Sequence, residues 1–282
     1  RAPSRPHPRT RPRRAVPRPV VSDPVWERQR RSFENTAEAY DRYRPTYPAA
    51  LFDDVRAYAD LAPDDQILEV GCGTGRATVR LAEWGNPVLA LEPAPAMAGF
   101  ARREVASFDN VKVRTARFED ADIGGGFGLA TCAQAWHWLE EHTRVQRFAD
   151  ALYAYGTAAI IANVQIVPDD NRAFWERVQD VYRKHTPGME HKGDFRTPDD
   201  LPEHPLTGSD LFVDHEHVAH PWHWTLRTDD YLQLCATHSN KAALDAATRD
   251  RLLGGIGELI DAEFEGQVTE HYMAMAGLAR KR

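Results

Sequence analysis

Apolar and polar positions alternate in two distinct rhythms from Val21 onward. Short continuous apolar runs between turn residues predict buried strands, whereas apolar residues spaced three and four apart predict helices with one buried face. The helical spacing occurs at residues 26–40, 51–58 and 145–152. The strand pattern occurs at residues 66–72, 87–92, 111–118, 127–135 and 158–165.

The rhythm changes after residue 165. Residues 166–209 carry one helical pattern, at 172–185, followed by a proline-rich loop. An insertion that follows the fifth strand is placed to cover a substrate, and a purely structural loop is the alternative. The chain continues with a strand at 211–224, helices at 229–238 and 242–264, and a last strand from Gln267.

Regular alternation of strands and helices predicts an α/β fold. Near-continuous apolar strands are buried on both faces, so we expect a doubly wound, Rossmann-like sheet that is mostly parallel and has helices on both sides. Ligands of such sheets bind at the carboxyl ends of the strands. The candidate chemistry is therefore expected where the strands end.

Length and composition indicate the number of domains and the cellular compartment. A chain of 282 residues with 42 % apolar content favours one domain with an insertion over two independent domains. No apolar run approaches the roughly 20 residues that span a bilayer. Cys72, Cys132 and Cys235 are odd in number and far apart, which indicates buried thiols in a reducing compartment. We expect a cytoplasmic protein without a membrane partner.

Charge is distributed unevenly along the chain. Residues 1–20 hold seven arginines, six prolines and no acid, so the net charge of −7 divides into +7 for this tail and −14 for residues 21–282. Such a tail lacks an apolar face and is expected to be disordered. An arginine-rich arm is able to bind nucleic acid, but the absence of interleaved aromatic residues and the acidic remainder argue against that partner.

A glycine-rich turn between a strand and a helix is the first candidate for chemistry. In "ILEVGCGTGRATVRLA", residues 67–82, Gly71, Gly73 and Gly75 stand at the first, third and fifth positions, and Arg76 stands at the sixth. Dinucleotide sites place a third glycine at the sixth position for close helix packing. The spacing therefore favours a nucleotide ligand other than a pyrophosphate, with an NAD-binding oxidoreductase as the alternative.

Two acids support this interpretation. Glu92 ends the second strand, where a carboxylate can accept hydrogen bonds from both hydroxyls of a ribose. Glu69 lies just before the glycines and adds a second negative charge. Two carboxylates would repel a phosphate but suit a cationic sulfonium with an ammonium group. For Glu69, a solvated acid at a strand end is the alternative.

At these motifs the sequence resembles the class I S-adenosylmethionine-dependent methyltransferases. "LEVGCGTG" at 68–75 is similar to their first motif and "LALEP" at 89–93 to their acidic second one. The stretches "YDRYRP" and "AQAWHW" are most similar to small-molecule enzymes of the trans-aconitate and quinone-precursor type. The resemblance implies a seven-stranded sheet with an antiparallel last strand, N-terminal helices in front of it, and S-adenosylmethionine as cofactor.

The resemblance also implies roles for individual residues. Phe118 would offer its backbone N–H to adenine, and Glu119 would accept from the exocyclic amine. The remaining expected cofactor contacts are Glu69, Gly71, Gly73, Gly75, Glu92, Gln134 and Trp136. The expected substrate contacts are Tyr40, Tyr43, Arg44, Trp138 and His238.

Methyl transfer requires few catalytic groups, because the gain in rate comes mainly from alignment in a dry pocket and from any base that the acceptor needs. His137 follows the fourth strand and is the candidate general base. The alternative is a histidine that only hydrogen-bonds the backbone of that turn.

A group of four histidines, His215, His217, His220 and His223, raises the question of a metal site. The first two would share one face of a strand, but the other two break the alternation, and no cysteine or acid completes a ligand set. We expect no metal.

The sequence thus predicts methyl transfer to a small molecule, for example a carboxylic acid or a secondary metabolite, by a monomer or homodimer. A non-catalytic nucleotide-binding protein of the same fold is a further alternative.

Overall fold

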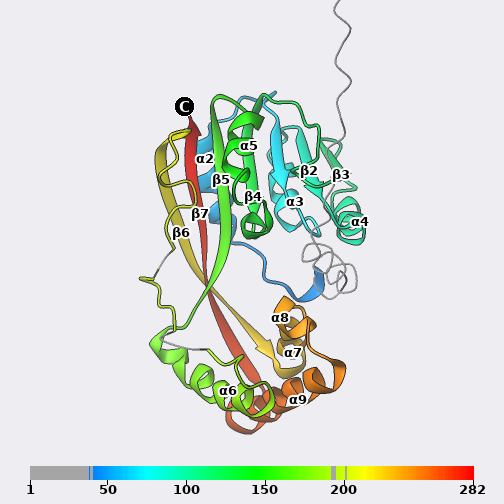
Figure 1. Ribbon diagram of the computed structural model, residues 1–282, viewed down its shortest axis with the longest axis vertical. Helices are drawn as coiled ribbons and strands as arrows, with labels where there is room; N and C mark the ends of the chain where they lie inside the picture. Colours follow the sequence, from blue (N-terminus) through cyan, green and yellow to red (C-terminus); the bar gives the residue numbers. More distant parts are fainter. Residues whose placement is uncertain (1–37, 39–40, 192–194, 201) are drawn as a thin grey trace, which may run out of the picture.

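A seven-stranded mixed sheet organises the chain. The computed structural model describes residue 38 and residues 41–191, 195–200 and 202–282. The strands stand in the order β3-β2-β1-β4-β5-β7-β6, and all of them except β7 run in the same direction (Figure 1). They are β1 (Ile67–Val70), β2 (Val88–Glu92), β3 (Val111–Thr115), β4 (Phe127–Ala133), β5 (Leu152–Ile166), β6 (Phe212–Arg227) and β7 (Gln267–Lys281). The predicted seven-stranded, mostly parallel sheet with an antiparallel last strand is confirmed.

Both faces of the sheet are buried. Ile67 and Leu68 are neighbours on β1 and both are fully buried, but they belong to different clusters of core side chains. Successive side chains of a strand point to opposite faces, so a strand between two helical layers is apolar throughout. The helices that supply these layers are α2 (Ala49–Ala59), α3 (Arg76–Ala82), α4 (Pro95–Glu104) and α5 (Arg144–Ala151).

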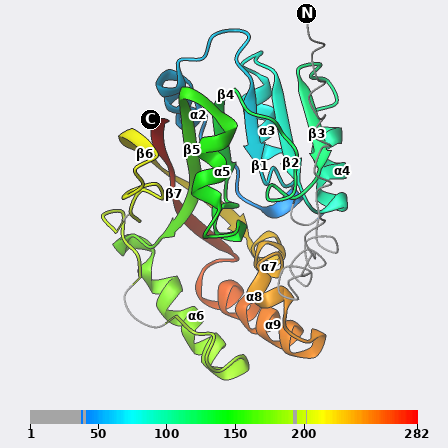
Figure 2. The same ribbon diagram turned by 45° about the horizontal axis from the view of Figure 1, so that its top comes forward.

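A second group of helices lies at the far end of the three longest strands. β5, β6 and β7 extend beyond the rest of the sheet and carry these helices at their ends (Figure 2). The helices share a separate core that includes Phe174, Leu234 and Ile256. They are α6 (Arg172–His185), α7 (Thr228–Ala236), α8 (Ser239–Ala242) and α9 (Ala246–Glu263). The inserted segment 166–209 therefore supplies only α6, and the rest of this group follows β6.

Several predicted boundaries are wrong by a few residues. Residue 152 begins β5 rather than ending the preceding helix, and the predicted helix at 242–264 begins only at Ala246. There the Asp245 carboxylate accepts from the Thr248 N–H at 2.9 Å and caps α9. Asp is a preferred residue at this position because it satisfies an unpaired helical N–H. The tail 1–20 and most of the helix at 26–40 lie outside the described residues.

Among the residues that the structure describes, no helix combines the length and the apolar character needed to cross a bilayer.

Candidate functional site

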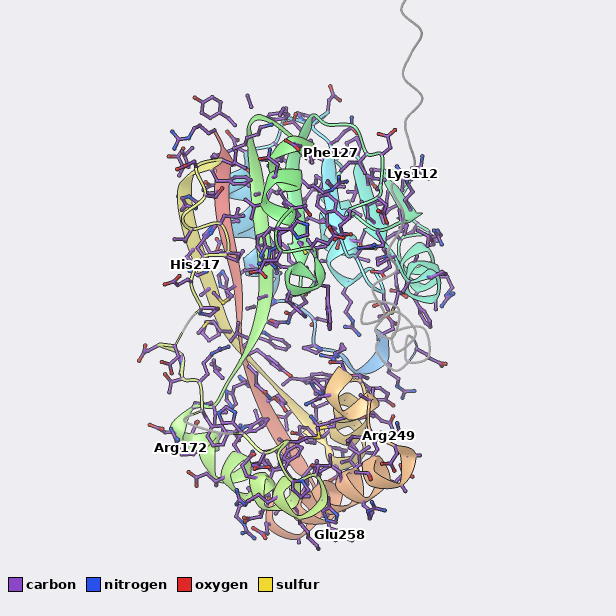
Figure 3. All side chains as sticks on the ribbon, in the orientation of Figure 1. Lys112, Phe127, Arg172, His217, Arg249 and Glu258 are labelled. Atoms are coloured by element: carbon purple, nitrogen blue, oxygen red, sulfur yellow. The ribbon has the colours of Figure 1, made fainter. Side chains whose placement is uncertain are left out.

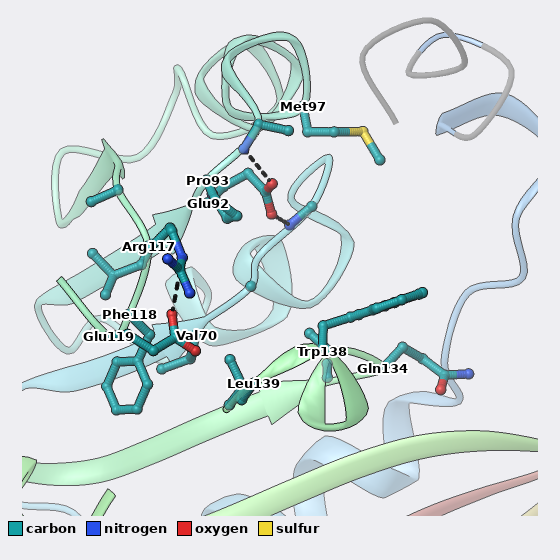
Figure 4. Close-up of a pocket in the computed structure, with 17 residues that line it drawn as sticks. Val70, Glu92, Pro93, Met97, Arg117, Phe118, Glu119, Gln134, Trp138 and Leu139 are labelled. Atoms are coloured by element: carbon teal, nitrogen blue, oxygen red, sulfur yellow. Dashed lines mark hydrogen bonds and ion pairs between the residues drawn. The ribbon is translucent and has the colours of Figure 1, made fainter. Parts of the chain in front are cut away.

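Two adjoining cavities open at the carboxyl ends of β1, β2 and β4. We call the first the apolar cavity; its walls include Leu91, Met97, Phe118 and Leu139 (Figure 4). We call the second the polar cavity; its walls include Arg44, Glu69, Arg76, His137, Asn163 and His238. Gly71, Gly73, Ala133, Gln134 and Trp138 line both cavities. The site therefore lies where ligands of doubly wound sheets bind.

Two glycines in the turn from β1 into α3 have different surroundings. Gly71 and Gly73 have φ angles of +71° and +58°, in the left-handed region that favours glycine. A Cβ on Gly71 would lie 2.5 Å from the Cβ of Ala135, while one on Gly73 would meet nothing within 4 Å. Gly73 is thus the position where backbone is open to a ligand.

Gly75 does not contribute to the cavities. It lines neither of them, and a Cβ there would lie 3.1 Å from the Cα of Ala101 on α4. Its contact allows α3 and α4 to pack closely, the role that dinucleotide sites give to a glycine one position later. Gly75 therefore has a packing role, its cofactor contact stays a prediction, and Arg76 lines the polar cavity.

Glu92 is fixed by backbone donors. Its two carboxylate oxygens accept hydrogen bonds from the N–H groups of Gly73 at 2.9 Å and Ala94 at 2.8 Å, as drawn in Figure 4. Burial raises the pKa of Glu92 to about 7, although the two N–H groups lower it. The remaining lone pairs of the carboxylate are available to donors in the apolar cavity. A pair of ribose hydroxyls would supply such donors.

Glu69 is a buried carboxylate that lacks a full set of partners. Only 1 % of the residue is exposed, and neither oxygen accepts a hydrogen bond of normal geometry from a described residue. Burial raises the pKa of Glu69 to about 7; the Thr78 hydroxyl lowers it in part, and the charge of Glu92 raises it further. A buried acid of this kind is costly unless a cation compensates it.

The expected adenine segment lines the apolar cavity. Phe118 is buried, and its carbonyl accepts from the Arg147 guanidinium. Glu119 accepts from the Glu140 N–H at 3.1 Å and lies 3.6 Å from the Arg117 guanidinium. The Glu119 carboxylate is therefore held in place beside the cavity, with lone pairs left for a further donor.

Gln134 has an unusual backbone. Its φ angle of +58° is rare for a residue other than glycine, and such strain is concentrated at functional sites. Its side-chain amide donates to the Asn163 carbonyl at 2.9 Å. Asn163 in turn donates to the Thr46 carbonyl at 2.8 Å and accepts from the Trp222 indole at 3.1 Å. These bonds connect the turn after β4 with the N-terminal segment and with β6.

Trp136 and Trp138 face different surroundings. Trp136 lines neither cavity; its ring packs edge-on against Phe148 at 5.1 Å, and the Arg144 guanidinium lies 4.9 Å from the centre of its ring. Trp138, expected only at the substrate, lines both cavities. Packing thus explains Trp136, and Trp138 is the aromatic residue at the junction.

Two histidines reach the polar cavity. His137 lies at its exposed rim, and partial burial together with the Arg144 charge lowers its pKa. Burial and the charges of Lys241 and Arg44 lower the pKa of His238 to about 3. Both rings are therefore neutral near pH 7, and the pKa of His238 is too low for that ring to accept a proton at neutral pH.

The N-terminal segment contributes Arg44 and Tyr47. The Arg44 guanidinium donates to the Thr237 carbonyl at 2.9 Å and lines the polar cavity. Tyr43, expected at the substrate, packs instead against the helical core of α6, α7 and α9. Tyr40 lies outside the described residues. Tyr47, which the sequence interpretation missed, also lines the cavity.

Other lining residues were missed because their signals are local and weak. Asn163 is one polar residue within the apolar run of β5, which is the one usable signal among them. Arg76 was noted only for its effect on packing. Asn240 reaches the polar cavity from α8, a connection that no sequence pattern indicates.

The four histidines of β6 do not converge. His215 and His217 lie near His204, with ring centres 4.9 Å and 5.7 Å away, on the edge strand where Figure 3 labels His217. His220 instead contacts Asp54 on α2 at 2.7 Å, and His223 faces His271 on β7. Within the described ranges, no group of three or more potential ligands has the geometry of a metal site.

The site fits S-adenosylmethionine on two structural grounds. The open backbone at Gly73 and the held carboxylate of Glu92 suit a ribose, and the uncompensated carboxylate of Glu69 suits a cation at the border of the two cavities. Phe118 and Leu139 supply apolar walls for a base. These residues would hold the cofactor with its nucleoside in the apolar cavity.

Known methyltransferases are similar to this chain in sequence. Residues 67–156 match the methyltransferase domain family. A Dictyostelium discoideum protein assigned by name to the methyltransferases is 30 % identical over 159 residues, which cover 53 % of this chain and 59 % of that protein. An uncharacterized methyltransferase of Mycobacterium tuberculosis is 29 % identical over 147 residues, which cover 52 % of this chain and 56 % of that protein. The chain thus spans a little over half the length of these relatives.

The solved structures agree on the fold. A structure assigned as a type II methyltransferase from Anaeromyxobacter dehalogenans superimposes with a TM-score of 0.57 at 23 % identity, covering 85 % of this chain and 98 % of that one. Together, the matched domain, the relatives and the glycine–glutamate site show that residues 67–156 form a methyltransferase domain, similar to those of the S-adenosylmethionine-dependent methyltransferases.

Proposed function

We propose that the protein transfers the methyl group of S-adenosylmethionine to a small molecule that carries an acidic group. The observation that carries the proposal is the pair of adjoining cavities, which share Gly73, Gln134 and Trp138. One cavity is apolar and holds the Glu92 carboxylate, as a nucleoside requires. The other is polar, has room for a second molecule of modest size, and adjoins the first at the position expected for the methyl group.

The lining of the polar cavity indicates the class of acceptor. Its guanidinium groups, Arg44 and Arg76, outnumber its one carboxylate, Glu69. The methionine carboxylate of the cofactor suits one arginine, and an acidic group of the acceptor suits the other, because guanidinium groups pair well with carboxylates and phosphates. Asn163, Ser239 and His238 add hydrogen-bonding groups that orient a polar molecule.

Bound S-adenosylmethionine supplies an activated methyl group. The residues of this chain would therefore act mainly by position: Trp138 closes the junction of the cavities, and α8 with the preceding His238 covers the acceptor side. Such a covered site excludes water and aligns the acceptor atom with the methyl group. If that atom carries a proton, the neutral ring of His137 receives it.

Because of Glu69, we expect the affinity for S-adenosylmethionine to depend on pH. Its pKa of about 7 in the protein without ligand means that the carboxyl loses its charge as the pH falls through that value. Protonation competes with a bound cation, so affinity for S-adenosylmethionine is expected to fall roughly tenfold between about pH 8 and about pH 6. Calorimetric titration at both pH values, with NAD as the comparison ligand, measures this change.

Glu69→Gln is the matched control for that titration. The variant keeps the size of the side chain but has no charge to lose, so its affinity is expected to be lower at the higher pH and to vary less with pH. Affinity of the unmutated protein that does not change with pH would remove Glu69 from the cation site. Binding of NAD in preference to S-adenosylmethionine would contradict the proposed cofactor.

A further inference from the structure

A third cavity lies between α6, the end of β5 and α8. We call it the distal cavity; its walls include Trp175 and Tyr182 of α6, Phe195 of the following loop, and Lys241 of α8. Asn240 lines both the distal cavity and the polar cavity. Asn240 therefore stands between the two cavities. It belongs to α8, in the group of helices at the far end of the sheet (Figure 1).

Aromatic rings form much of the distal wall. The rings of His191 and Phe195 are stacked, with centres 4.9 Å apart and planes inclined by 16°. The Trp175 ring lies 6.4 Å from that of Phe195. Rings already arranged in this way offer flat apolar surface to a third ring at little entropic cost.

The charged groups of this cavity balance one another. Lys241 and Arg196 are opposed by Glu190 and Asp200, so the lining has no excess of either sign. Lys241 is itself buried, with its ammonium 5.5 Å from the centre of the Tyr182 ring. A lining with balanced charge does not favour an anion, in contrast to the cationic lining of the polar cavity.

One buried donor in this wall has no acceptor. The indole N–H of Trp175 is shielded from solvent and makes no hydrogen bond to any described residue. An unpaired buried donor carries a free-energy cost that a ligand oxygen would remove.

We propose that the distal cavity binds the far end of the methyl acceptor. This inference rests on the proposed function: the acceptor is an elongated acid whose acidic end occupies the polar cavity and whose aromatic end passes Asn240 to lie among the rings of the distal cavity. Two observations carry the inference. Asn240 lines both cavities, and the polar cavity has an excess of cationic groups whereas the distal cavity has balanced charge and aromatic rings.

Two acids of different length test the proposal. The protein is first saturated with S-adenosylhomocysteine, and phenylacetate and 6-phenylhexanoate are then titrated by calorimetry. The longer acid has four more methylene groups with which to place its ring beyond Asn240, so we expect it to bind at least about tenfold more tightly, as the burial of a ring predicts. Equal affinities, or no binding of either acid, would overturn the proposal.

Three variants complete the test. Trp175→Ala, and Phe195→Ala in case the first variant does not fold, should each bring the ratio of the two affinities close to one. Tyr155→Ala removes an aromatic residue that is 67 % exposed and lines none of the three cavities, and should leave the ratio unchanged. A ratio that survives the loss of both distal rings contradicts the inference. Failure of S-adenosylhomocysteine to bind would instead contradict the proposed function.

Discussion

Replacing Glu92 with alanine should weaken S-adenosylmethionine binding by at least about tenfold, because each hydrogen bond to a charged acceptor contributes about 1.5 to 3 kcal/mol. The variant loses the carboxylate that the ribose hydroxyls would meet and also the anchor of the Gly73 backbone. Calorimetric titration gives the change in affinity, and thermal unfolding shows that the protein remains folded.

Glu92→Gln is the informative companion to this variant. Glutamine still offers one oxygen to the N–H of Gly73 or Ala94 but carries no charge, so its affinity should lie between those of the other two proteins. A dissociation constant of Glu92→Ala equal to that of the unmutated protein would remove Glu92 from the cofactor site.

Replacing His137 with alanine should lower turnover at saturation by roughly 10², the usual effect of removing a positioned base, while cofactor affinity changes by a few-fold at most. Partial burial and the Arg144 charge lower the pKa of His137 below its ordinary value of 6.5. The rate of the unmutated enzyme should therefore persist through neutral pH and decline only below about pH 6.5, as the ring becomes protonated.

His142→Ala is the matched control for His137. This nearby histidine has a side chain that is 79 % exposed and lines neither cavity, so its loss should leave turnover unchanged. If His137 only orders the turn after β4, stability and cofactor affinity of His137→Ala would fall together while saturated turnover is kept. Full turnover with an unchanged pH profile would exclude the base.

The sequence was sufficient for the parts of the site that depend on local pattern. A buried strand, a glycine turn and a helix determine where Gly71 and Gly73 lie, and the acid at the end of β2 must reach the same edge of a parallel sheet. Each of these relations involves adjacent elements whose geometry is nearly fixed. Glu92 was therefore predictable without knowledge of the tertiary packing.

The tryptophans show why the turn after β4 was not predictable in detail. Trp136–Trp138 form a single turn of 3₁₀-helix, in which successive side chains point about 120° apart. Trp136 consequently faces the core at Phe148, His137 the rim and Trp138 the junction of the cavities. An alternating or α-helical conformation of the same residues would have given a different assignment.

The part of the polar cavity that would hold the methyl acceptor is built from segments that lie far apart in the sequence. Asn240 of α8 reaches the polar cavity only because β5, β6 and β7 extend beyond the sheet and bring α6 to α9 together. The extra length of these strands comes from pairing over residues 157–166 with 271–280, far apart in sequence. Local periodicity contains no information on such a pairing, so residues 166–209 alone were assigned to the cover.

Transfer of labelled methyl groups tests the central claim most directly. In each reaction the protein is incubated with S-adenosylmethionine labelled in its methyl group and with one candidate acceptor. The acceptors are small carboxylic acids, phenols and amines of matched size. The account predicts a labelled product from an acidic acceptor, with one S-adenosylhomocysteine formed for each methyl group transferred, and loss of this activity in Glu92→Ala at limiting cofactor. Tight cofactor binding without transfer to any member of the panel, or transfer confined to the amines, would contradict it.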